Sequence, residues 1–86
     1  MVTSCSSVSQ KYANDYYDQG LVFYERMEYA RSVESFNKVL ELEPNGKDNY
    51  KVYYNRGIAF LKNRQYTQAI YDFTKALELV PAGQKK

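Results

Sequence analysis

The first half of this 86-residue chain recurs in its second half at a constant offset of 37 residues, with no gap. Self-similarity at a period of tens of residues is typical of stacked supersecondary units, so it constrains the architecture more than any local motif does. The residues that recur are mainly packing and turn residues, which indicates a scaffold whose function lies on its surface. The clearest pairs are Tyr16/Tyr53, Tyr17/Tyr54, Gly20/Gly57, Phe23/Phe60, Tyr29/Tyr66, Phe36/Phe73, Leu40/Leu77, Leu42/Leu79 and Pro44/Pro81.

Apolar residues within each copy recur at helical spacing, which predicts an all-α fold. Pro44, Asn45 and Gly46 interrupt the pattern between the copies, because proline cannot continue a helix and Asn-Gly favours a turn. Consecutive helices are expected to pair into two antiparallel hairpins. The predicted helices run from Tyr12 to about Met27, from Tyr29 to just before Pro44, from an N-cap at Asp48 to about Lys62, and from Tyr66 to about Leu79.

These boundaries define the expected domain organisation. Residues 1–11 are rich in serine and lack helical periodicity, so they are predicted to be a flexible lead. The two hairpins are predicted over 12–46 and 47–81, followed by a flexible tail over 82–86.

Composition limits the chemistry that the chain can perform. There is no histidine, which removes the usual general base, and a single cysteine allows neither an internal disulfide nor a cysteine-based metal cluster. The acidic pairs Asp15/Asp18, Glu25/Glu28 and Glu41/Glu43 are interpreted as solvated helix faces, because no second catalytic group accompanies them. We therefore expect no enzyme activity, no cofactor and no metal site.

Charge is distributed unevenly along the chain. Residues 1–43 carry four Lys/Arg and seven Asp/Glu, giving −3, whereas residues 44–86 carry eight and three, giving +5. The asymmetry fits chance clustering on a solvated surface, attraction between copies, or an acidic partner for the second half. Without a Lys/Arg stripe it does not predict nucleic-acid binding, and no segment approaches the ~18 apolar residues of a membrane span.

Glycines inside two of the predicted helices indicate close helix packing. Gly20 and Gly57 each cost roughly 1 kcal/mol relative to alanine in a helix interior. Close approach of the second helix of each hairpin would offset that cost, because it carries Ser32 or Ala69 at the predicted crossing.

The recurring aromatic residues, glycines, small residues and prolines make the chain resemble tandem tetratricopeptide repeats, a family with a period of about 34 residues. The resemblance covers residues 13–81 and implies a short right-handed α-solenoid of two stacked hairpins. Three departures stand out. Gln19 and Arg56 replace the usual leucine, which predicts a polar contact with solvent or with an ion partner at these positions. Met27 and Arg64 replace the glycine of the inner turn, and residues 47–49 are an extension between the units that is expected to lengthen the start of the third helix by nearly a turn. The matching positions are Tyr16, Gly20, Phe23, Ser32, Phe36, Val39 and Pro44 in the first unit, and Tyr53, Gly57, Phe60, Ala69, Phe73, Ala76 and Pro81 in the second.

The resemblance implies a protein-interaction module that binds a partner peptide or helix in a concave groove lined by the first helix of each hairpin. A clamp for a terminal carboxylate, known in the family, is disfavoured because Tyr17 and Leu21 occupy positions where Lys and Asn would be needed. An apolar segment is therefore the expected ligand. Carried over by position, the groove residues are Asn14, Tyr17, Leu21, Tyr24, Lys51, Tyr54, Asn55, Ile58, Leu61 and Lys62.

A second surface is expected on the last helix, because stacked repeats normally bury the outward face of each hairpin under the next unit. Without such a unit, self-association into a homodimer is the alternative function. The residues of this predicted self-association face are Ile70, Tyr71, Phe73 and Leu77.

The sequence as written predicts a cytoplasmic protein. Val2-Thr3-Ser4-Cys5 resembles the end of a bacterial lipoprotein signal, but the apolar stretch that such a signal requires upstream is missing. The first interpretation of Cys5 is a free thiol on the flexible lead. The alternative, in which Met1 is not the native start, is that Cys5 carries a lipid that anchors a periplasmic scaffold protein.

Overall fold

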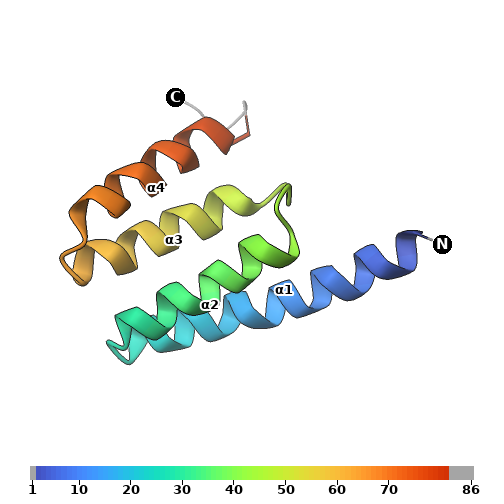
Figure 1. Cartoon of the computed structure of the whole chain (residues 1–86), viewed down its shortest axis with the longest axis horizontal. Coiled ribbons are helices and arrows are strands. Elements are labelled where there is room, and N and C mark those ends of the chain that lie inside the picture. The colour runs from blue at the N-terminus through green and yellow to red at the C-terminus, as the bar shows by residue number, and fades with distance from the viewer. Residues whose placement is uncertain (1, 82–86) are drawn as a thin grey trace.

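The fold consists of four helices arranged as two antiparallel hairpins that lie side by side (Figure 1). The computed structural model describes the backbone of residues 2–81 and the side chains of residues 8–81. Helices α1 (Val2–Glu25) and α2 (Tyr29–Leu42) form the first hairpin, and α3 (Asn49–Lys62) and α4 (Tyr66–Leu79) form the second. Helix α3 packs against both α2 and α4, so it joins the two hairpins. This arrangement confirms the all-α class and is that of a short helical-repeat solenoid.

Helix α1 begins much earlier than the sequence indicated. The structure places residues 2–11 in α1, where a flexible lead was expected, so that prediction was wrong for the backbone it covers. The segment contains neither Gly nor Pro. Extending a helix that is already nucleated costs far less than starting one, so the packed turns from Ala13 onward can propagate the helix through it. The predicted tail over 82–86 lies outside the described residues.

Each hairpin closes through contact between a glycine of one helix and a phenylalanine ring of the other. A Cβ atom at Gly20 would lie 2.5 Å from Cε1 of Phe36, and one at Gly57 would lie 2.8 Å from Cε1 of Phe73. In the first hairpin the Ser32 hydroxyl also donates a 2.7 Å hydrogen bond to the carbonyl of Gly20. The close approach predicted from the helical glycines is therefore present in both hairpins.

The turns inside the hairpins have the same backbone geometry although they lack glycine. Met27 and Arg64 both adopt a left-handed conformation with φ of 63°. The next amide donates back to the last helical turn in each, from Glu28 to the Phe23 carbonyl at 2.8 Å and from Gln65 to the Phe60 carbonyl at 2.8 Å. This is a Schellman motif, in which glycine is the usual left-handed residue. Both turns are thus formed at a conformational cost.

Two of the three extra residues between the hairpins form a turn, so the extension does not add a further turn to α3. Lys47 and Asp48 lie in the turn, and α3 starts at Asn49, whose buried side-chain amide donates a 2.7 Å hydrogen bond to the carbonyl of Glu43. Asp48 occupies the N-cap position, but its side chain makes no capping hydrogen bond.

The core lies where the first hairpin meets α3. Its buried residues are Ala13 of α1, Phe36 and Val39 of α2, and Val52 of α3. Phe36 is fully buried, whereas its counterpart Phe73 is only half-buried. The duplicated sequence therefore occupies two different environments, because α3 covers α2 while no described element covers the outer side of α4.

Candidate functional site

Seven of the ten predicted groove residues line two neighbouring hollows between α1 and α3. Asn14, Tyr17 and Lys51 border the larger one. The smaller one has a volume of about 40 Å³ and is lined by Leu21, Tyr24, Phe36, Asn55 and Ile58. We use the term groove below for the surface formed by the ten predicted residues.

A hydrogen bond between the two helices joins a residue of the larger hollow to a residue of the smaller one. The Asn55 amide donates to the Tyr17 hydroxyl at 2.8 Å, linking α3 to α1. The Tyr17 ring packs against Phe36, with ring centroids 5.8 Å apart. Burial raises the pKa of the Tyr17 phenol, while the nearby Lys51 ammonium and the hydrogen bond from Asn55 act in the opposite direction. Tyr17 is thus a groove residue whose side chain also links α1 to α3 and packs against α2.

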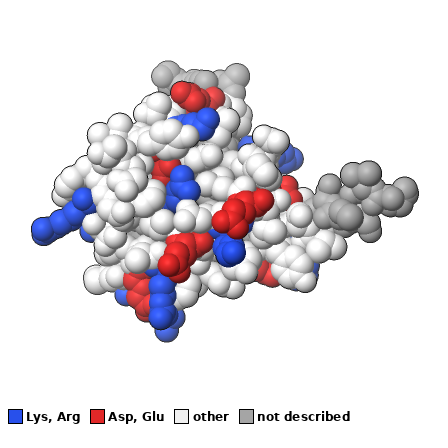
Figure 2. All heavy atoms as spheres, in the orientation of Figure 1, with Lys and Arg blue, Asp and Glu red and all other residues white. Residues whose placement is uncertain are grey.

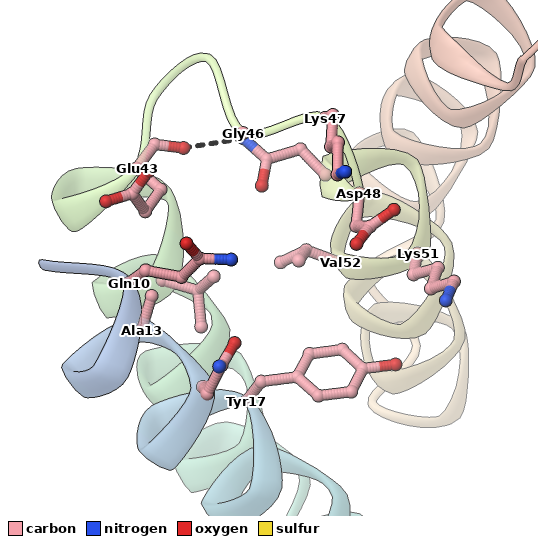
Figure 3. A pocket seen from close by; sticks show the side chains of 12 residues that line it. Gln10, Ala13, Tyr17, Glu43, Gly46, Lys47, Asp48, Lys51 and Val52 are labelled. Atoms are coloured by element: carbon pink, nitrogen blue, oxygen red, sulfur yellow. Dashed lines mark hydrogen bonds between the residues drawn. The ribbon is translucent and has the colours of Figure 1, made fainter. Parts of the chain in front are cut away.

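The larger hollow has a volume of about 240 Å³ and lies beside the connection between α2 and α3 (Figure 3). Its apolar wall contains Ala13, Val39 and Val52, and Val52 points from α3 toward Gln10 of α1. Lys47 and Asp48, which belong to the three-residue extension, line its rim. Sequence reasoning did not find this hollow, although the offset of 37 in place of the family period of about 34 was the available signal.

The remaining three predicted groove residues lie apart from the hollows. Tyr54 is 53% exposed, and its ring packs toward α4, 5.9 Å from the ring of Phe73. Leu61 and Lys62 are exposed near the end of α3, and neither borders a described hollow.

The predicted self-association face on α4 is largely open. Ile70, Tyr71 and Leu77 are 66%, 58% and 70% exposed. Phe73 differs from them, because it is half-buried and packs inside the second hairpin against Gly57 and Tyr54.

Arg56 of α3 forms a buried polar network that the sequence only partly indicated. It donates two 2.8 Å hydrogen bonds to the carboxylate of Asp72 in α4, and a third of 2.8 Å to the side-chain oxygen of Asn37 in α2. The guanidinium also lies over the ring of Phe60, 5.6 Å from its centroid. The replacement of leucine by Arg56 suggested an ion partner, but Asp72 was not recognised as that partner. The signal was the parallel change from Ser35 in the first copy to Asp72 in the second.

Charged side chains of both signs are interspersed on the face seen in Figure 2, where the described residues form no continuous basic stripe. None of the described helices is both long and apolar enough to cross a membrane. Among the described residues no cluster of three potential metal-ligating side chains occurs.

The fold defines a helical-repeat protein in which two hairpins stack, with α1 and α3 as the first helix of each. Two family models described as tetratricopeptide repeat match adjacent parts of the chain, one over residues 16–46 and the other over 50–82. The chain belongs to the tetratricopeptide repeat family. The two matches exclude residues 47–49, which form the extension between the hairpins. Comparisons with curated proteins and with solved structures gave no significant match.

Proposed function

We propose that this protein binds an apolar segment of a partner protein in the groove between α1 and α3. Tetratricopeptide repeats are generally protein–protein interaction modules. The observation that carries the proposal is the pair of hollows whose walls combine apolar and amide side chains from both helices. A larger hollow of about 240 Å³ has room for a bulky side chain, while Asn14 and Asn55 offer hydrogen bonds to a peptide backbone. Nothing in this role requires catalysis.

Substitution of an exposed ring tests the groove. Tyr54→Ala removes an aromatic side chain that is 53% exposed, and we expect it to weaken capture of peptides selected on the wild-type chain at least tenfold. Tyr71→Ala is the matched control, because Tyr71 is 58% exposed but lies on α4 outside the groove. Isothermal titration calorimetry with the selected peptides gives both affinities. Equal affinity of Tyr54→Ala and the wild type, or loss in Tyr71→Ala alone, would contradict the proposal.

Self-association through α4 is a second candidate function, supported by a comparison within the chain. Val33 and Leu40 of α2 are half-buried, and α3 packs against their helix. Their counterparts Ile70 and Leu77 are 66% and 70% exposed. The same apolar pattern is thus covered in one hairpin and open in the other. Two copies that pair symmetrically through α4 would bury it.

This second candidate is tested by sedimentation equilibrium across a range of concentrations. We expect the wild-type chain to approach a dimer and Leu77→Glu to remain a monomer near 10.1 kDa. Val22→Glu is the control, because Val22 is also exposed, at 52%, but lies on α1. A wild-type monomer at the highest concentration would rule out this role while leaving the groove proposal intact.

The lipid-anchor interpretation of Cys5 stays a prediction, since its side chain lies outside the described part of the chain. The codons upstream of Met1 in the native gene would test it.

A further inference from the structure

The apolar residues of the groove correspond pair by pair between α1 and α3, whereas the charged residues beside them do not. Helix α1 carries two carboxylates beside the groove residues, because Asp18 lies one helical turn after Asn14 and Glu25 one turn after Leu21. The equivalent positions 37 residues later are Asn55 and Lys62, and Lys51 adds a second ammonium group on α3. The α1 side of the groove is therefore acidic. The α3 side is basic, because Lys47 and Asp48 on the rim of the larger hollow offset each other and leave Lys51 and Lys62.

These four charges are available to a ligand. Asp18, Glu25, Lys51 and Lys62 are all exposed. Within residues 8–81 none of them takes part in an ion pair, although the pairs Lys38–Glu41 and Lys75–Glu78 do form elsewhere. Lys51 also lines the larger hollow, so one of these ammonium groups belongs to a side chain that borders the hollow expected to receive a ligand side chain.

We infer that the groove selects a bipolar segment: an apolar centre, basic residues where the segment crosses α1, and acidic residues where it crosses α3. This inference rests on the proposed groove function. A segment that contacts both helices faces both walls, so a uniformly charged ligand gains attraction at one wall and meets repulsion at the other. Only a segment with opposite charges on its two sides is attracted by both. The same argument disfavours a polyanion such as nucleic acid, because Asp18 and Glu25 would repel it.

The inference is tested by selecting a random peptide display library on three forms of the full chain. On the wild type, selected peptides should have an apolar centre with basic residues toward one end and acidic residues toward the other. Lys51→Glu/Lys62→Glu makes both walls acidic and should select peptides that are basic at both ends. It should also bind the wild-type peptides about tenfold more weakly at low salt, with the difference shrinking as salt is added. Lys38→Glu/Lys75→Glu makes the same change in net charge outside the groove and should select the wild-type pattern.

A reciprocal variant shows whether the result for Lys51→Glu/Lys62→Glu could arise from a fold defect instead of the charge change. Asp18→Lys/Glu25→Lys makes both walls basic and should select peptides that are acidic at both ends, while helical circular dichroism checks that each variant is folded. If selected peptides depend on Tyr54 but carry no ordered charges, or if all variants select the same pattern, the charge inference is overturned and the groove proposal stands. If no selected peptide depends on Tyr54, the groove proposal itself fails.

Discussion

Arg56 and Asp72 form a bidentate ion pair in the interior of the second hairpin, with both hydrogen bonds at 2.8 Å. The Arg56 side chain is 16% exposed and that of Asp72 is 1% exposed. Because Asn37 accepts a third hydrogen bond from the same guanidinium, the pair also connects α3 and α4 to α2. One arginine thus replaces the usual leucine of the family and fixes how the two hairpins stack.

Removing one member of this pair should be far more costly than replacing both. Arg56→Leu leaves the Asp72 carboxylate buried without its partner, and we expect it to lower the free energy of unfolding by about 3–5 kcal/mol. Arg56→Leu/Asp72→Ala should recover most of that loss, because no uncompensated charge remains. Urea denaturation followed by circular dichroism measures both. A double variant as unstable as the single one would show that the pair contributes mainly through its contact with Asn37.

The two helical glycines should differ in their tolerance of alanine. Gly20→Ala would place its methyl group against Phe36, which is 0% exposed and cannot move aside, so we expect a loss of about 1–3 kcal/mol. Gly57→Ala meets the half-buried ring of Phe73, which can shift toward solvent, so the loss should be smaller. Thermal unfolding of the two variants ranks them directly. The opposite order would mean that the outer hairpin is the more rigidly packed one.

The two inner turns offer stabilising substitutions. Met27 and Arg64 hold a left-handed conformation that costs an L-residue roughly 1–2 kcal/mol, whereas glycine adopts it freely. Met27→Gly and Arg64→Gly should each raise the free energy of unfolding by up to about 1 kcal/mol. Glu34→Gly, in the interior of α2, is the control and should lower it by about 1 kcal/mol. A loss of stability in both turn variants would contradict the turn geometry.

Tyr17 should make stability depend on pH in the alkaline range. Burial raises the pKa of its phenol above the ordinary value of 10.0, so the folded chain holds this proton more tightly than the unfolded chain does. The contribution is fully present below pH 10.0 and is lost as the pH rises through the pKa of folded Tyr17. Tyr17→Phe should therefore lose less stability than the wild type between about pH 9 and 11. Urea denaturation at a series of pH values measures the free energy of unfolding of both proteins. If it falls equally in the two proteins over this pH range, the expectation is contradicted.

The repeat pattern was sufficient to predict the four helices apart from the start of α1, their pairing into hairpins, and the close helix approach at Gly20 and Gly57. Each of these features depends on residues within one hairpin, such as Gly20 and Ser32, or on an apolar periodicity that recurs in both copies. The helical boundaries near Pro44 followed from the same local chemistry.

The features that were not predicted depend on contacts between units or on cooperativity. Residues 2–11 were misjudged because serine content describes local preference, while helix propagation depends on the packed turns that follow. The partner of Arg56 required knowing which positions of α3 and α4 meet. The larger of the two groove hollows depends on the path of Lys47 and Asp48, which form a turn where a helical extension was expected.

Mapping of amide chemical-shift changes by NMR, on titration with a peptide selected on the wild-type chain, tests the central claim most directly. If α1 and α3 together form the binding surface, the largest changes should fall on Tyr17, Leu21, Asn55 and Ile58. Ile70 and Leu77 of α4 should change little. Changes concentrated on α4, with the groove residues unaffected, would contradict the account.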